Sequence, residues 1–364
     1  MTTLEKLLTN IWYTEKNHDL NPAYFFLSFS ALLYSAAIRL RNLFYDHGLL
    51  GQAGLRCPVI SVGNLSVGGT GKTPMVIHLA GLMAGWGLKP AVLSRGYRGG
   101  SGKKVNVVSD GRSILSGPGD GGDEPFLIAG RLPAVPVLTG PRRSVTGEYA
   151  LSHFGIDIVI LDDGFQHRSL QRDLDIVLLD SRLPLGNGRL IPRGPLREPF
   201  SSLKRADLIV LTRAVTGEKT PFESRLAEEL PATPVFKSCH SPRRLTEGRE
   251  NSRPLSDLAG RKIYAFAGVA RPDSFRESIE SLQGTIVGFR VFPDHHRYRS
   301  EDFAELEKEA RSLGADLVLT TEKDGVKLTP HGEFASRVWI LGIELEIIEE
   351  AERFETVIRK KLGV

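Results

Sequence analysis

A glycine-rich loop constrains this chain more than any other feature. Residues 61–74 read SVGNLSVGGTGKTP, in which an apolar stretch leads into three glycines and then into Lys72 and Thr73. Backbone N–H groups of such a loop and of the helix after it wrap phosphate oxygens. The lysine reaches the β- and γ-phosphates, and the next hydroxyl holds Mg²⁺. The strict pattern has glycine where Ser66 stands. We expect a nucleoside triphosphate to bind at Ser66, Val67, Gly68, Gly69, Thr70, Gly71, Lys72 and Thr73.

An apolar segment followed by two carboxylates predicts the metal side of this site. Residues 158–161 are Ile-Val-Ile-Leu, and Asp162 and Asp163 follow directly. In open α/β sheets, ligands bind beyond the carboxyl ends of the strands. A carboxylate there orients Mg²⁺ directly or through water. Asp162 is the first candidate beside Thr73, and Asp163 and Glu198 are further candidates.

Alternating apolar segments and helical stretches predict the fold class. Of the 364 residues, 41% are hydrophobic and 25% are charged, which is a globular composition with room for two domains. We expect a P-loop NTPase-type parallel sheet covered by helices on both faces and a second, smaller α/β domain. The predicted limits are 1–50 for an N-terminal amphipathic helix region, 51–240 for the nucleotide-binding domain and 241–364 for the smaller domain. Residues 214–255 read as a linker. Strands are predicted at 59–62, 91–94, 156–161, 176–179, 208–211, 262–267, 285–292, 317–320 and 338–341.

The N-terminal helix predicts contact with a membrane surface. No charged residue occurs from Leu20 to Ile38, and Asn21-Pro22 is a typical helix start. The polar face of this helix contains Ser28, Ser35, Arg39, Asn42 and Asp46, and an interfacial helix needs such a face whereas a spanning helix does not. Packing on the protein body and a true span are the alternatives. The apolar face contains Phe25, Phe29, Leu32, Leu33, Ala36, Leu40, Leu43 and Phe44.

Charge and cysteine content exclude other classes. The net charge is +4, which is too weak to indicate a nucleic-acid partner, and no protein partner is evident. Cys57 and Cys239 form neither a disulfide framework nor a metal motif, which is typical of a reducing compartment.

Further segments indicate phosphoryl transfer instead of nucleotide hydrolysis alone. A GTPase needs an Asn-Lys-x-Asp motif, and residues 321–324 (Thr-Glu-Lys-Asp) have the wrong spacing. A kinase needs a base and cations around the transferred phosphoryl. Asp123 follows a flexible glycine pair, and Arg197 lies in a proline-stiffened loop. His295 and His296 follow Asp294 after a predicted strand, a cluster that also permits a metal interpretation.

Taken together, these motifs resemble the tetraacyldisaccharide 4′-kinase family. The match runs in order through residues 61–74, LSRGY (93–97), GDEP (122–125), LDDGFQH (161–167), GPLREP (194–199), FPDHH (292–296) and TEKD (321–324). The resemblance implies ATP- and Mg²⁺-dependent phosphorylation of the 4′-hydroxyl of a lipid A disaccharide 1-phosphate precursor. It places this reaction at the cytoplasmic face of the inner membrane of a Gram-negative bacterium.

The resemblance also implies roles for individual residues. Asp123 and His295 match the family's acid–base dyad, and the choice of His295 over His296 rests on the resemblance. Lys72 would hold phosphates, and Arg197 would neutralise charge on the phosphoryl group or on the lipid's own phosphate. Because His295 belongs to the second domain, closure of the domains would assemble the site. The rival hypotheses are a regulatory P-loop NTPase acting on a protein partner and a kinase for a soluble small molecule.

Overall fold

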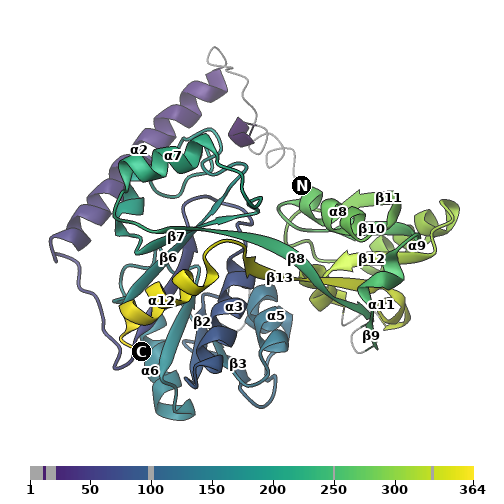
Figure 1. The fold of residues 1–364 in the computed structure, drawn as a ribbon, viewed down its shortest axis with the longest axis horizontal. Coiled ribbons are helices and arrows are strands. Elements are labelled where there is room, and N and C mark those ends of the chain that lie inside the picture. Colours follow the sequence, from purple (N-terminus) through teal and green to yellow (C-terminus); the bar gives the residue numbers. More distant parts are fainter. Residues whose placement is uncertain (1–10, 14–21, 97–101, 249–250, 329–331) are drawn as a thin grey trace.

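One continuous sheet runs through both lobes of the molecule (Figure 1). The computed structural model describes residues 11–13, 22–96, 102–248, 251–328 and 332–364. Asn21 and Tyr97, which belong to the predicted helix start and to one family motif, lie outside these ranges. Within the described residues the sheet has 13 strands in the order β11-β10-β12-β13-β8-β7-β6-β1-β5-β2-β4-β3, with β9 paired to β8.

The strands and helices have the following bounds. The strands are β1 (Val59–Asn64), β2 (Pro90–Ser94), β3 (Asn106–Asp110), β4 (Pro136–Thr139), β5 (Ile158–Asp162), β6 (Leu174–Asp180), β7 (Leu208–Thr212), β8 (Val235–Glu247), β9 (Asn251–Arg253), β10 (Lys262–Ala267), β11 (Thr285–Val291), β12 (Leu317–Thr321) and β13 (Trp339–Ile347). The α-helices are α2 (Pro22–Asp46), α3 (Lys72–Gly85), α4 (Pro118–Gly121), α5 (Asp123–Arg131), α6 (Arg143–Phe154), α7 (Pro221–Glu229), α8 (Pro272–Ser281), α9 (Ser300–Ser312), α10 (Glu322–Gly325), α11 (Gly332–Arg337) and α12 (Ala351–Leu362). The 3₁₀ turns in the described ranges are η1 (Phe200–Arg205), η2 (Leu255–Leu258) and η3 (Val326–Leu328).

The first lobe, formed by β1 to β7 with their helices, is the predicted parallel α/β layer structure. β1 lies between β5 and β6 and is parallel to both. Its strands are buried on both faces, as their uninterrupted apolar sequences require. Helices α3, α5 and α12 cover one face, while α6, α7 and η1 cover the other. The sequence does not predict β3 and β4, which extend the sheet at its outer edge.

Two long strands, β8 and β13, connect the lobes (Figure 1). The start of β8 is parallel to β7, and the strand then continues as an antiparallel partner of β13. The prediction of a linker over residues 214–255 is therefore wrong, because this segment contains α7, β8 and β9. The second half of β8 is partly exposed and contains Ser, Pro and two Arg residues. It therefore lacks the apolar run that indicates a buried strand.

The C-terminal helix α12 returns to the first lobe after the chain has completed the second. Phe354 and Ile358 are fully buried in the first-lobe core. The Phe354 ring packs edge-on against Phe236 at a centroid distance of 5.2 Å. The second lobe, formed by β10 to β12 with α8 to α11, has its own core on each face of the sheet. The helix thus lies apart from the rest of the segment 241–364.

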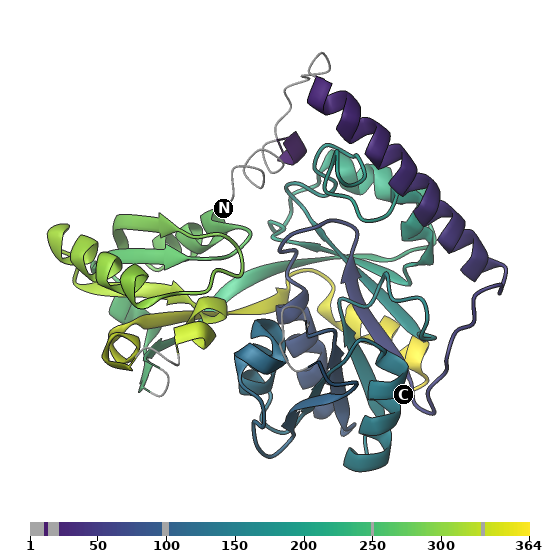
Figure 2. The same ribbon diagram turned by 180° about the vertical axis from the view of Figure 1, so that it is seen from behind.

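Helix α2 lies along the outer edge of the first lobe (Figures 1 and 2). Tyr34 donates from its hydroxyl to the carbonyl of Arg197 at 2.9 Å, and Arg193 donates to Ser28 at 2.7 Å. The apolar residues of the predicted outer face are all exposed, Phe25 by 78% and Leu32 by 66%. Among the described helices, none has both the length and the apolar content of a membrane span.

Candidate active site

The phosphate loop (residues 66–73) is held open between β1 and α3. Gly71 precedes α3 with φ of 87°, and a Cβ at this position would lie 2.6 Å from Nε2 of His240. Glycine is required there on both grounds. The amide of Val67 donates to the carbonyl of Pro195 at 2.8 Å, so the segment carrying Arg197 supports the loop. The N–H groups at the start of α3 have no partners within the helix, as at any helix start, and such groups are suited to bind phosphate.

Lys72, Asp163 and Arg197 form one ionic group. Nζ of Lys72 lies 3.4 Å from Oδ1 of Asp163. Arg197 donates to both oxygens of the same carboxylate at 2.9 and 2.8 Å. Burial by itself would raise the pKa of Asp163, but the two cations outweigh it and lower the pKa to about 2. Asp163 is therefore ionised at neutral pH and holds both cations beside the phosphate loop.

Asp162 lies deeper and has the opposite protonation behaviour. Its Oδ2 accepts from the hydroxyl of Ser94 at 3.0 Å, whereas Oδ1 is buried without a partner. Burial raises the pKa of Asp162 to about 7, and the negative charges of Glu124 and Asp163 add to the effect. A carboxylate with a buried unpaired oxygen at the end of β5 is suited to a cation.

Asp123 and His295 meet across the two lobes. Nδ1 of His295 lies 3.4 Å from Oδ2 of Asp123, which is the first residue of α5. His295 has φ of 60°, a left-handed conformation that the surrounding fold must hold in place. His296 points elsewhere, since its Nε2 contacts Asp302 at 2.9 Å and its ring stacks on Phe292. The structure therefore places His295, and not His296, beside Asp123.

The structure does not bring Glu198 into this group. Glu198 is fully buried, and its carboxylate accepts from Arg41 at 3.3 Å, Asn42 at 2.7 Å and Arg205 at 2.9 Å. The cations that neutralise it come from α2 and η1, so this carboxylate anchors α2 to the body. We therefore remove Glu198 from the candidate metal ligands. Among the residues described, no three His, Cys, Asp or Glu side chains form a group that could hold a metal.

Several charged residues near the site escaped the sequence analysis. Glu124 and Lys323 form an ion pair at 2.9 Å beside Asp123 and His295. Arg143, at the start of α6, is 4% exposed, and burial lowers its pKa while Asp162 and Asp163 oppose this effect. His240 lies against Gly71, and burial lowers its pKa to about 4. Glu124 lies in the GDEP motif and Lys323 in the TEKD motif, but nothing in the sequence indicates that these two side chains meet.

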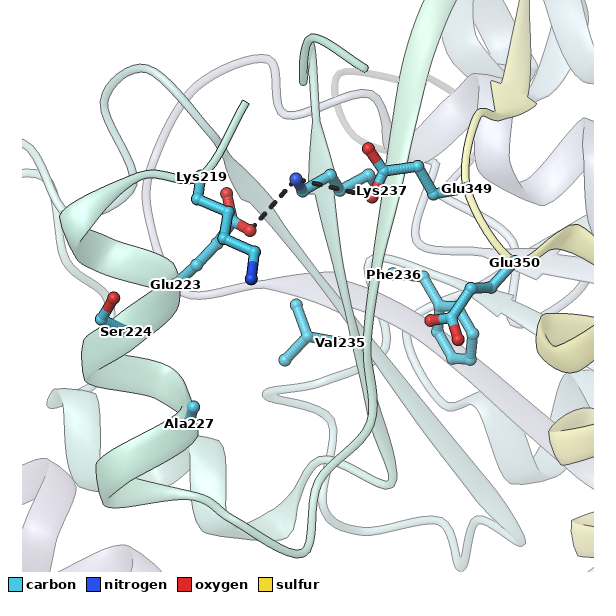
Figure 3. A pocket seen from close by; sticks show the side chains of 9 residues that line it. All are labelled: Lys219, Glu223, Ser224, Ala227, Val235, Phe236, Lys237, Glu349 and Glu350. Atoms are coloured by element: carbon cyan, nitrogen blue, oxygen red, sulfur yellow. Dashed lines mark ion pairs between the residues drawn. The ribbon is translucent and has the colours of Figure 1, made fainter. Parts of the chain in front are cut away.

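A pocket of about 330 Å³ between α7, β8 and the start of α12 contains none of the predicted site residues (Figure 3). Lys237 extends toward Glu223 at 3.2 Å and Glu349 at 3.5 Å. These ion pairs join α7 to the segment after β13. We therefore assign this pocket to the packing at the base of the arm formed by β8 and β13.

The strand–loop–helix unit, the carboxylates after β5 and the Asp123–His295 pair, with one member from each lobe, define a P-loop phosphotransferase. A model of the tetraacyldisaccharide-1-P 4′-kinase family matches residues 23–363. The chain belongs to this family, so the predicted family and the predicted kinase class are confirmed. The family assignment does not favour the rival regulatory NTPase.

Relatives and a solved structure agree with this assignment. A tetraacyldisaccharide 4′-kinase of Syntrophus aciditrophicus is 48% identical over 342 residues, with 90% of this chain and 91% of the relative covered. One from Anaeromyxobacter sp. strain Fw109-5 is 45% identical over 320 residues, with 87% and 85% covered. The crystal structure of the "apo" form of LpxK from Aquifex aeolicus in complex with ATP superposes with a TM-score of 0.73 at 34% identity, covering 91% of this chain and 97% of that one.

Proposed function

We propose that this chain transfers the γ-phosphoryl group of ATP to the 4′-hydroxyl of a tetraacyldisaccharide 1-phosphate in lipid A biosynthesis. The products are lipid IVA and ADP. The observation that carries the proposal is the contact between Asp123 and His295, which come from different lobes. Glu124, the chain neighbour of Asp123, is near enough to Lys72 of the phosphate loop for that charge to lower its pKa. Family membership supports the choice of acceptor.

Each group has a distinct part in the transfer. Asp123 accepts the proton of the 4′-hydroxyl while the hydroxyl oxygen forms a bond to the γ-phosphorus. The bond from this phosphorus to the β–γ bridging oxygen breaks, and ADP leaves. The loop amides and Lys72 hold the β- and γ-phosphates. Lys72 exchanges its 3.4 Å contact with Asp163 for the nucleotide. Arg197 stays on Asp163 and adds positive charge near the transferred group.

Mg²⁺ fits the residues present at the end of β5. It prefers oxygen ligands and retains waters and substrate phosphates, so it needs few protein groups. The hydroxyl of Thr73 and the carboxylates of Asp162 and Asp163 would hold it, and the unpaired Oδ1 of Asp162 supports this assignment. Bound there, the cation would neutralise phosphate charge.

We further propose that α2 binds the membrane surface, at the cytoplasmic face of the inner membrane. The polar residues Ser28, Asn42 and Asp46 are bonded to the first lobe, and the apolar side of the helix is exposed. A continuous apolar strip of this kind is suited to the acyl boundary of a bilayer, where the acceptor lipid resides.

The decisive experiment follows labelled phosphate from [γ-³²P]ATP to detergent-dispersed tetraacyldisaccharide 1-phosphate by thin-layer chromatography. Wild-type enzyme should label the lipid, and Asp123→Asn should lower kcat by roughly 10²–10⁴-fold with ATP binding retained. Retained turnover in Asp123→Asn would exclude this residue as the base. Release of free phosphate without labelled lipid would contradict the acceptor and favour the regulatory NTPase.

A further inference from the structure

Lys323 reaches from the second lobe to the side of the His295 ring that faces away from Asp123. Its Nζ lies 2.9 Å from Oε1 of Glu124, 3.1 Å from Oδ1 of Asp294 and 3.4 Å from Nε2 of His295. A lysine ammonium has three N–H donors and no acceptor, and here three acceptors surround it. Two of these belong to the chain neighbours of the dyad, and the third belongs to His295 itself.

The TEKD motif explains why Lys323 is held in this position. The hydroxyl of Thr321 accepts from the amide of Asp324 at 3.2 Å and caps the short α10. Asp324 is fully buried and accepts from the amide of Gly268 at 2.8 Å. Glu322 is paired with Arg131 of α5 at 2.8 Å. Contacts on both sides of Lys323 thus hold the turn in place. The Lys323 side chain extends to Glu124 of the first lobe.

The charges of this group persist at neutral pH. Burial by itself would lower the pKa of Lys323, but Glu124 and Asp294 more than offset this effect, and the pKa is raised. Burial would raise the pKa of Glu124, whereas Lys323 and Lys72 lower it. Lys323 therefore remains an ammonium and donates hydrogen bonds under the conditions of catalysis.

An ammonium beside Nε2 determines the tautomer of His295. Lys323 can only donate, and its Nζ at 3.4 Å is nearer to Nε2 than Oδ2 of Asp294 at 3.9 Å. The lysine therefore favours a lone pair on Nε2 and the ring proton of the neutral imidazole on Nδ1. Nδ1 then donates to Oδ2 of Asp123, the contact seen at 3.4 Å. In the other tautomer, a lone pair on Nδ1 would face the lone pairs of Asp123, and the orienting hydrogen bond would be lost.

We propose that Lys323 is a positioning residue that fixes the Nδ1–H tautomer of His295 and so orients Asp123 toward the acceptor hydroxyl. The inference rests on the proposed role of Asp123 as the base. Lys323 acts through His295 and bridges the lobes through Glu124, so the dyad is oriented only when the lobes meet.

The test combines kinetics with ¹⁵N NMR of the full-length enzyme labelled on histidine. The His295 ring signals are assigned by their absence in His295→Gln. We expect the wild type to carry its ring proton on Nδ1 and Lys323→Met to shift toward the Nε2–H form. We also expect kcat to fall roughly 10–100-fold in Lys323→Met, the usual loss for a residue that orients a functional ligand, with the KM for ATP nearly unchanged.

Glu277→Gln is the matched control, because Glu277 of α8 pairs with Arg182 of the first lobe at 2.6 Å and so joins the lobes away from the dyad and from α10. It should leave the His295 tautomer unchanged. A proton on Nε2 in the wild type, or an unchanged tautomer in Lys323→Met, overturns the proposal. If Lys323→Met fails to fold, the wild-type spectrum and the Lys323→Arg variant test the proposal instead. Lys323→Arg should keep the Nδ1–H form and retain part of the wild-type kcat.

Asp123→Asn, assayed in parallel, separates the two levels of inference. If Asp123→Asn retains turnover, the proposed base is wrong and the role of Lys323 in orienting it fails as well. If Asp123→Asn is inactive while Lys323→Met is no slower than Glu277→Gln, only the role of Lys323 fails.

Discussion

Adjacent aspartates acquire opposite protonation behaviour from their surroundings. Asp163 is paired with Lys72 and Arg197, and its pKa falls to about 2. Asp162 is buried, has one unpaired oxygen and lies near two other carboxylates, and its pKa rises to about 7. The backbone alone cannot produce this difference, since the residues are neighbours in the chain. It arises from which side chains the fold directs at each carboxylate.

The first prediction follows from the raised pKa of Asp162. Between about pH 4 and 7, Asp162 keeps its proton in the folded protein and releases it in the unfolded chain. The free energy of unfolding is therefore highest below about pH 4, and this contribution is lost as the pH rises through about 7. Without nucleotide and Mg²⁺, Asp162→Asn should raise Tm by roughly 2–6 °C at pH 8, with the gain shrinking toward pH 4. Differential scanning calorimetry across this pH range measures it.

Asp163→Asn is the matched control for that prediction and should have the opposite sign. The pKa of Asp163 is lowered when folded, so its contribution is present above pH 4 and is lost as the pH falls through 2. Asp163→Asn should therefore lower Tm at pH 8. Equal shifts in the two variants would contradict the assignment of separate environments.

Helix α2 inverts the usual orientation of an amphipathic helix. Ser28, Asn42 and Asp46 are bonded to the protein, whereas the eight residues of the predicted apolar face are exposed. The buried carboxylate of Glu198 anchors it through Arg41 and Asn42. The neighbouring Arg197 in turn holds Asp163, and its amide donates to the carbonyl of Leu65 at 2.7 Å. The segment that anchors the helix is therefore the one that supports the phosphate loop.

The second prediction concerns this anchor. Glu198→Ala leaves Arg41 and Arg205 without their shared carboxylate, and loss of one partner of a buried pair costs about 3–5 kcal/mol. Urea denaturation should show this loss. Glu277→Ala is the control, because the Arg182–Glu277 pair is half-exposed and such pairs contribute about 0–1 kcal/mol. Similar losses in both variants would mean that Glu198 is not an anchor.

The third prediction tests the exposed face of α2. Replacing Phe25, Phe29 and Leu32 by serine removes exposed apolar side chains without touching the bonds to the body. Co-sedimentation with phospholipid vesicles should drop at least tenfold, while turnover of a short-chain soluble acceptor stays near the wild-type rate. Leu115→Ser, an exposed leucine on the first lobe, should leave both unchanged. Unaltered vesicle binding in the triple variant would assign α2 to another partner.

At the scale of the whole molecule, the chain crosses between the lobes twice. It leaves the first lobe along β8, builds the second, and returns along β13 to place α12 on the first-lobe core. The lobes also meet at the site through Lys323 and, farther along α5, through Arg131. The contact between Asp123 and His295 therefore depends on how the two lobes meet. The strands β8 and β13 connect the lobes, and these ion pairs stabilise the contact between them.

The fourth prediction is that the last helix stabilises the first lobe. Phe354→Ala should lower the unfolding free energy by about 3–5 kcal/mol, because it opens a cavity beside Phe236. Hydrogen exchange should speed up in β6 and β7 and stay unchanged in β10. Phe275→Ala, in the second-lobe core, should show the reverse pattern. Faster exchange confined to β10 in Phe354→Ala would contradict the placement of α12.

Features that depend on a local pattern could be predicted from the sequence. Loop residues 66–73, the apolar strands of the first lobe and the two faces of α2 follow from spacing and periodicity along a few turns of chain. Tertiary structure decided the rest. Asp123 and His295 are 172 positions apart, and Lys323 meets Glu124 from 199 positions away. Contacts between residues so far apart depend on the order of strands in the sheet. The same order places β8 in the sheet, although its segment is too polar to indicate a strand. No local pattern encodes that order, because it is set by which buried faces pack together once the whole chain has folded.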